Sequence, residues 1–119
     1  MIQKGTFVSP ADNSGVLWAR VFHLHYGFSR RVAYTGGFTK VSVRETLPNN
    51  WLSKKTKCKA IILRTRKELK KYDGSYVRFN INNVVLLKKR MNCYGTVILG
   101  PIPSTIRRRK FSRSFPGVI

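Results

Sequence analysis

Acidic side chains are almost missing from this chain of 119 residues, which carries 4 Asp and Glu residues against 24 Lys and Arg residues. Asp12 and Asp73 lie in turn motifs, where a carboxylate accepts hydrogen bonds from nearby backbone amides. The other two acids, Glu45 and Glu68, are not spaced as a catalytic carboxylate pair. The chain also lacks a GxxxxGK phosphate loop and a GxSxG nucleophile elbow. These absences argue against an enzyme, and we expect no catalytic residue and no cofactor.

Cysteines and long apolar runs are scarce as well. Cys58 and Cys93 lie 35 positions apart without a CxxC partner, which argues against a disulfide framework and against a zinc site. Reduced thiols are typical of a reducing compartment. No apolar run approaches the roughly 18 residues of a membrane span. The first residues, Met1 to Lys4, open neither a hydrophobic signal peptide nor an Arg- and Ser-rich transit segment. We therefore expect no membrane partner and a protein that is used where it is made.

The chain does contain short β-rich runs separated by turn residues. Valines alternate with polar residues over 39–44, which predicts a strand with one buried face. The continuous apolar centre of 59–65 predicts a strand that is covered on both faces, and 72–75 is a strong turn signal. Further strands are predicted at 17–24, 76–80, 84–87 and 95–99. Several short strands at this spacing predict a mainly β protein with a small closed or nearly closed barrel.

Helix is scarce in this sequence. Ser104 is a suitable N-cap, and it predicts one short helix over 104–111. Residues 112–119 read as a tail or an extended docking segment. No linker or internal repeat divides the chain, so we expect a single domain over 1–119.

The formal net charge of +20 is the strongest positive signal. An isolated fold with this charge repels itself, and a polyanion would cancel the repulsion and release counterions on binding. Apolar residues make up 42% of the chain, which indicates a folded basic protein and not a disordered tail. The cations form clusters at expected loops and strand ends: Arg30–Arg31, Lys54–Lys55 with Lys57 and Lys59, Arg64, Arg66 and Lys67 with Lys70 and Lys71, Lys88 to Arg90, and Arg107, Arg108 and Arg109 with Lys110 and Arg113.

Aromatic residues are interleaved with these clusters and could stack on unpaired bases. Trp51 and Tyr72, which lie beside turns, suit that role or a packing role equally. Phe79, in an expected strand, suits the core better. His23 and His25 would share one strand face, but no third ligand is evident. We expect them to be packed or to face RNA, and we expect no metal site.

Two motifs are highly specific when taken together. ADNSG stands at 11–15, and RTRKE at 64–68 leads into DGSYVRF at 73–79. With SRR at 29–31, VSVRE at 41–45, Lys54–Lys55, Gly95–Thr96 and Gly100–Pro101, the set resembles the family of the universal large-subunit ribosomal protein fourteen, from Met1 to about Phe111.

This resemblance implies a five-stranded β-barrel with a projecting hairpin and a small C-terminal helical region. It also implies a structural protein that binds the large-subunit rRNA on the face that meets the small subunit. Implied partners are the ribosomal proteins three and nineteen, the small-subunit rRNA through intersubunit bridges, and the ribosome silencing factor.

Particular residues take expected roles from the resemblance and from the charge clusters. Thr96, Val97 and Arg113 fall where the family meets its silencing factor or the small subunit, although Val97 replaces the usual Arg. The expected rRNA contacts are Arg30, Arg31, Lys54, Lys55, Arg64, Arg66, Lys67, Arg78, Arg107, Arg108 and Arg109.

Departures from the family pattern mostly remove acids. Gly36–Gly37 stands where the family has Gly-Asp, Asn80 replaces an Asp, and 114–119 replaces an ending that contains Glu. A divergent copy rich in Lys, Asn and Phe and without a presequence is typical of a mitochondrion-encoded protein. We therefore expect the mitochondrial large subunit first, a bacterial cytoplasm second and a plastid third.

Three rival functions follow from the residues alone. A free single-strand-binding or translation-factor barrel would need aromatics aligned on one exposed sheet face. A membrane-active or lectin-like basic protein would need a contiguous apolar or amphipathic surface. An RNA-modifying enzyme would need more acids than this chain has.

Overall fold

The computed structural model describes residues 2–25, 31–48, 52–88, 93–95 and 98–103. Seven strands and no helix lie in this part of the chain. The predicted helix over 104–111 and the tail at 112–119 fall outside the described residues. The strands are β1 (Phe7–Pro10), β2 (Val16–Leu24), β3 (Phe38–Thr46), β4 (Lys57–Arg64), β5 (Leu69–Lys70), β6 (Tyr76–Val77) and β7 (Asn83–Leu87).

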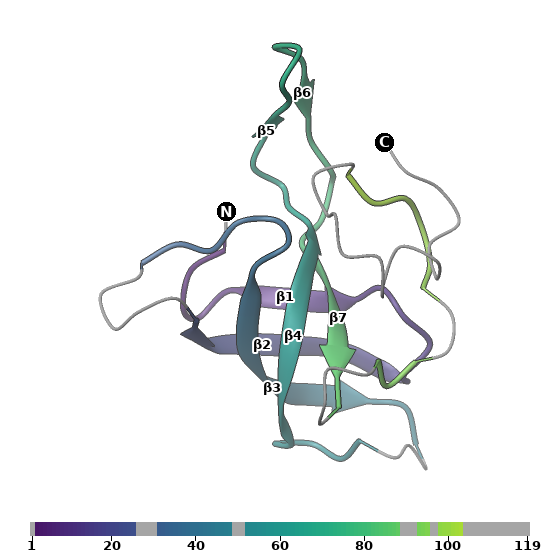
Figure 1. The fold of residues 1–119 in the computed structure, drawn as a ribbon. Helices are drawn as coiled ribbons and strands as arrows, with labels where there is room; N and C mark the ends of the chain where they lie inside the picture. Colours follow the sequence, from purple (N-terminus) through teal and green to yellow (C-terminus); the bar gives the residue numbers. More distant parts are fainter. Residues whose placement is uncertain (1, 26–30, 49–51, 89–92, 96–97, 104–119) are drawn as a thin grey trace.

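Five of the strands form a closed barrel in the order β1-β2-β3-β4-β7 (Figure 1). Every pairing is antiparallel except that of β1 with β7, which is parallel and closes the barrel. Closure leaves no free edge among the five barrel strands for pairing with another chain. The prediction of a mainly β fold with a five-stranded barrel is confirmed.

The barrel interior is filled by small and β-branched side chains from all five strands. Along β3, Val41 and Val43 are fully buried while Lys40 and Arg44 are exposed, as the alternation predicted. The interior cluster also takes residues from the loops, such as Ile2 and Leu52. Its strand members are Val8, Val16, Ala19, Val21, Leu24, Val41, Val43, Ala60, Ile62, Val84 and Leu86.

A second apolar cluster covers the outside of the barrel over β4 and β7. Ile61 and Leu63 of β4 pack there, whereas their neighbours Ala60 and Ile62 face the interior. The covering segment includes Ile98 and Ile102, and it is held by a hydrogen bond from the amide of Leu99 to the carbonyl of Ala11 (2.7 Å). The prediction that the apolar run of β4 is covered on both faces is confirmed. The other flank, formed by β2 and β3, has no such cover among the described residues.

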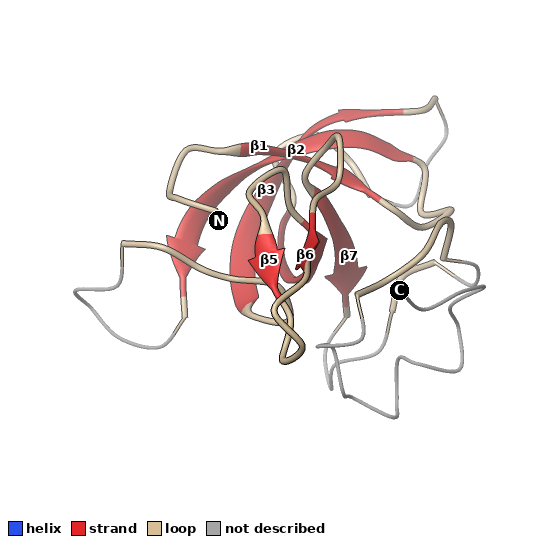
Figure 2. Ribbon diagram, turned by 90° about the horizontal axis from the view of Figure 1, so that it is seen from above, coloured by secondary structure: helices blue, strands red, loops and turns tan. Residues whose placement is uncertain are grey.

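The strands β5 and β6 form a separate hairpin that projects beyond the end of β4 (Figure 1), and Figure 2 looks down on it with the barrel behind. Gly74 at its tip has φ +88°, a value that costs glycine nothing and other residues about 1–2 kcal/mol. The Oδ1 of Asp73 accepts hydrogen bonds from the amide and hydroxyl of Ser75 at 3.0 and 2.6 Å. Both the projecting hairpin and its turn are therefore confirmed.

Several element boundaries differ from the prediction. The expected strand at 76–80 ends at Val77, because the next backbone contact, from the amide of Phe79 to the carbonyl of Thr65 (3.2 Å), folds the chain back to the barrel. Phe79 is half-buried but belongs to neither apolar cluster. In the expected strand at 95–99, Ile98 forms an isolated bridge to Asp12, and 96–97 lie outside the described residues. β1 was not predicted, since it is short and ends in proline.

No helix in the described part of the chain has the length and apolar character to cross a membrane.

Candidate nucleic-acid interface

The predicted rRNA contacts do not converge on one site. Lys54 and Lys55 are exposed in the turn before β4, and Arg66 and Lys67 are exposed beyond its other end. The eight residues of β4 separate the two groups by roughly 25 Å. The predicted contacts therefore mark two ends of the barrel.

The other predicted contacts are distributed differently. Arg78 is exposed just after β6, where the chain leaves the hairpin. Arg31 is exposed two residues before Ala33, which bridges to Ile2. The predicted residues outside the described part of the chain are Arg30, Thr96, Val97, Arg107, Arg108, Arg109 and Arg113.

Arg64 has a structural partner that the sequence did not predict. Its Nη2 donates a hydrogen bond to the carbonyl oxygen of Leu99 at 3.0 Å. The side chain is half-buried, and burial lowers the pKa of its guanidinium from the usual value. A Cβ atom on Gly100, which has φ +82°, would collide with Nη1. Arg64 thus ties the covering segment to the end of β4, and its role as an rRNA contact stays a prediction.

Between the two ends lies a surface that we name the cationic face: the outward side chains of β1, β2, β3 and the start of β4. Its cations are exposed on regular strands and not in loops. Glu45 is the one acid within the sequences of those four strands. The exposed Leu17, His23 and Glu45 lie on the same strands. We take as members of the cationic face the cations and aromatic residues of these strands together with Ser42: Phe7, Trp18, Arg20, Phe22, Lys40, Ser42, Arg44, Lys57 and Lys59.

Strand register aligns four of these side chains in a row. Phe7 pairs with Arg20, Arg20 with Ser42, and Ser42 with Lys57 across four consecutive strands. The Arg20 guanidinium carbon lies 5.8 Å from the centre of the Phe7 ring. Trp18 meets the same ring edge to face at 4.9 Å. Aromatic and cationic groups therefore lie next to one another on this surface.

Two of the three register shifts between β2 and β3 turn further side chains of this face outward. Val21 pairs with Val41 and His23 with Lys40, so Phe22 is the extra residue on β2. A similar shift between the pairs Trp18–Glu45 and Ala19–Val43 makes Arg44 the extra residue on β3. Bulges are a common means of re-aiming side chains, and both Phe22 and Arg44 are exposed.

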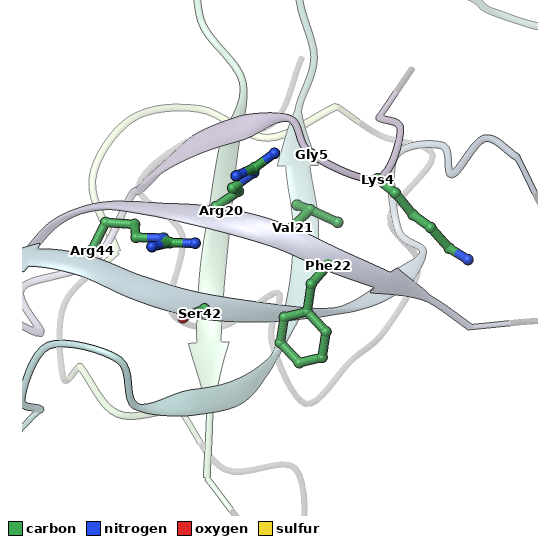
Figure 3. Close-up of a pocket in the computed structure, with 7 residues that line it drawn as sticks. All are labelled: Lys4, Gly5, Arg20, Val21, Phe22, Ser42 and Arg44. Carbon is green, nitrogen blue, oxygen red and sulfur yellow. The ribbon is translucent and has the colours of Figure 1, made fainter.

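The bulged residues line an open groove of about 350 Å³ (Figure 3). Gly5, with φ +89°, lies in its wall, and a Cβ atom there would stand 3.5 Å from Nη2 of Arg20. The guanidinium of Arg20 therefore lies against the backbone of Gly5, and Figure 3 shows it pointing that way. The lining residues are Lys4, Gly5, Arg20, Val21, Phe22, Ser42 and Arg44.

The two histidines at the end of β2 report the electrostatics of this flank. Their rings meet edge to face at 5.5 Å, which confirms that they lie together. The pKa of His25 is lowered from its usual value, first by burial and then by the electrostatic effect of Lys59, His23 and Lys40. The described residues contain no group of three or more His, Cys, Asp or Glu side chains that could hold a metal ion.

Sequence reasoning missed the core of the groove. Lys4, Arg20 and Arg44 were not among the predicted contacts, because each is an isolated cation and not part of a cluster. The alternation of Lys40, Ser42 and Arg44 with valines was the available signal, since it places these residues on the outer face of one strand. The bulges had no recognisable sequence signal.

The fold and this surface together define a class of protein: a small, closed and strongly cationic β-barrel without catalytic apparatus among its described residues. The family model of Ribosomal protein L14p/L23e matches residues 1–115. Over all 119 residues, and over the whole of both chains, the sequence is 52% identical to the large ribosomal subunit protein uL14m of Tetrahymena pyriformis. The chain belongs to the Ribosomal protein L14p/L23e family.

Family membership confirms the resemblance that the motifs indicated. It gives the chain a structural role in the large ribosomal subunit, and this family is not a family of enzymes. The relative from Tetrahymena is a mitochondrial protein, in agreement with the first of the three predicted locations.

Proposed function

We propose that this protein is an rRNA-binding structural component of the large subunit of the mitochondrial ribosome. The observation that carries the proposal is the net charge of +20 spread over a closed barrel, at both ends of β4 and on the cationic face between them. Cations distributed in this way suit a protein surrounded by RNA. Contacts to phosphates would fix its position without reading base sequence.

The finer assignment concerns the place of the protein in the subunit. We propose that it lies on the face that meets the small subunit, beside the ribosomal proteins three and nineteen, and that it contributes to intersubunit bridges. Thr96, Val97 and Arg113 are the residues proposed to meet the small subunit or the silencing factor. Family membership supports this assignment, and the valine at 97 predicts a weaker silencing-factor contact than an arginine would give.

Sedimentation of a mitochondrial lysate through density gradients at increasing salt concentration tests the proposal. An integral ribosomal protein should stay with the large-subunit rRNA at about 0.5 M salt, whereas a peripheral electrostatic binder loses affinity steeply between low and moderate salt. Release to the top of the gradient would contradict the proposal.

Charge variants at the two ends of β4 sharpen this test. Lys54→Glu with Lys55→Glu, or Arg66→Glu with Lys67→Glu, should lower incorporation into the large subunit. Lys54→Arg with Lys55→Arg is the matched control and should incorporate normally. These positions are exposed, so the variants should keep the barrel folded, which a thermal melt can check.

A second function is favoured by one specific observation. Phe7, Trp18 and Phe22 lie on one outer face of the barrel, which is the arrangement that a single-strand-binding barrel needs. A free binding factor of that kind would leave the large subunit in the same gradient. The gradient therefore distinguishes it from an integral protein.

A further inference from the structure

We propose that the cationic face binds an unpaired segment of RNA, with bases stacked on Phe22 and Phe7 and phosphates held by Arg20 and Arg44. The proposal rests on the proposed rRNA-binding function and specifies the form of RNA that this face takes. In this proposal the cationic face binds single-stranded RNA, and the cations at the two ends of β4 contact phosphates of single-stranded and duplex RNA alike.

The exposure of the aromatic rings is the first argument. Phe7 and Phe22 are 58% and 41% exposed, although aromatic side chains gain most from burial. The bases of a duplex already stack on one another, so a duplex would offer these rings only its sugars and phosphates. An unpaired base has a free π-face, and stacking on an aromatic side chain is the usual way in which proteins hold it.

The spacing of the rings is the second argument. Phe7 lies opposite Arg20 on the neighbouring strand, and Phe22 lies two residues farther along β2. Strand geometry therefore separates the two positions by roughly 8 Å. Stacked bases are much closer than this, about 3.4 Å apart along one strand of B-form DNA, so the rings suit an extended strand with its bases unstacked.

Each ring also has a cation within reach. Arg20 lies over Phe7 at 5.8 Å, and the Nζ of Lys57 lies 5.9 Å from the centre of the Phe22 ring. A nucleotide stacked on either ring would have its phosphate next to a positive charge. Arg20 is held in place between Phe7 and the backbone of Gly5, so little side-chain freedom would be lost on binding.

A protein partner suits this surface less well. The buried centres of protein interfaces are enriched in aromatic residues and arginine but depleted in lysine, and this face presents Lys40, Lys57 and Lys59 beside the groove. Here Lys4, Arg20 and Arg44 line the groove itself, and Lys57 stands over its aromatic ring. Buried against an ordinary protein surface these charges would lose their water without gaining partners.

The fluorescence of Trp18 gives a direct readout. The chain has two tryptophans, so a Trp51→Phe background leaves Trp18 as the single emitter, in contact with Phe7. The purified full-length chain would be titrated with a single-stranded oligouridylate and with an RNA duplex of the same length at one salt concentration. The single strand should quench Trp18, and the duplex should bind with little change in Trp18 emission.

Substitutions separate stacking from charge. Phe22→Ser should weaken single-strand binding roughly 5-fold to 160-fold, the range for a lost base–aromatic stack, and leave duplex binding unchanged. Tyr34→Ser, at an exposed tyrosine in the loop before β3, is the matched control and should alter neither. Arg44→Gln should weaken single-strand binding, lower its salt dependence by about one phosphate contact, and leave duplex binding unchanged.

The outcomes distinguish this proposal from the one on which it rests. If Phe22→Ser weakens single strand and duplex equally, or neither, the stacking proposal is overturned while RNA binding stands. If the wild-type chain binds neither RNA, the proposed function itself fails. If Phe22→Ser leaves RNA binding intact but removes a ribosomal protein from purified subunits, the face belongs to a protein partner and the proposal is wrong. Thermal melts of each variant show whether the barrel is folded.

Discussion

Replacing Arg64 by alanine should destabilise the barrel, although Arg64 belongs to a basic cluster of the kind that usually faces solvent. The guanidinium donates a 3.0 Å hydrogen bond to the carbonyl of Leu99 and lies where a Cβ atom of Gly100 would be. The segment that it holds carries Ile98 and Ile102, which cover the outer faces of β4 and β7. Loss of the arginine should therefore loosen that cover.

The expected cost follows from the contact. Hydrogen bonds to charged groups contribute about 1.5–3 kcal/mol when buried. Arg64 is only half-buried and Leu99 is exposed, so water would replace part of the bond and we expect the lower end, about 1.5 kcal/mol. In a chain of this size that loss lowers the Tm by roughly 5–8 °C. Arg78→Ala, at an exposed position on the hairpin arm, should change the free energy of unfolding by less than about 0.5 kcal/mol.

Urea unfolding of the purified chain, read by circular dichroism, measures both variants. A double-mutant cycle with Gly100→Ala adds a stricter test. In the wild type this substitution meets both the positive φ and the guanidinium, and in Arg64→Ala only the positive φ remains. Gly100→Ala should therefore cost less in the Arg64→Ala background. Equal stability of Arg64→Ala and Arg78→Ala, together with strict additivity in the cycle, would refute the reasoning.

Three further predictions concern the hairpin and two titrating groups. Gly74→Val should weaken the hydrogen-exchange protection of the amides of Lys71 and of residue 74, because the turn has φ +88°. The Tm of the barrel should not fall, since the space around the turn is open. Unchanged protection would contradict this prediction. Burial raises the pKa of Cys58 to about 11 from 9.0, so iodoacetamide should modify this thiol roughly 100-fold more slowly in the folded protein at pH 8 than in urea. The contribution of the buried thiol to stability is complete below pH 9.0 and should be lost as the pH rises through about 11. Equal modification rates would count against this burial. Burial and nearby cations lower the pKa of His25, so the free energy of unfolding should fall as the pH drops below 6.5. Bound RNA phosphates near Lys59 should raise the pKa of His25 in an NMR titration. An unchanged pKa would place the RNA elsewhere.

The elements that the sequence predicted well are those with a clear hydrophobic period. The valines of β3 and the apolar run of β4 are examples, because burial of one or both faces leaves a direct mark on residue order. The turn at Asp73–Gly74 was predictable because only a few residue types tolerate its backbone. β1 was not predicted, because its four residues include a proline and depend on pairing with β7, a neighbour far along the chain.

The candidate site was predicted less completely than the fold. Runs of cations indicated Lys54–Lys55 and Arg66–Lys67, and the structure places these pairs on exposed turns. The cationic face depends on long-range register, which aligns Arg20, Ser42 and Lys57 from three strands, and such alignment has no local signal. Arg64 was predicted as an rRNA contact because it lies in a basic run, but it donates a hydrogen bond to Leu99. A basic run does not reveal which of its members has a partner within the fold.

The parallel pairing of β1 with β7 has a consequence for how the protein is made. β1 and β2 leave a translating ribosome early, but the barrel cannot close before Asn83–Leu87 has also emerged. The hairpin between β4 and β7 lengthens that interval. Until closure, the nascent chain has unpaired edges on β1 and β4 and a large excess of positive charge, and open edges readily pair with other strands. A chain that stops short of β7 should therefore aggregate or need a chaperone, and early association of its cationic strands with RNA would protect it during synthesis.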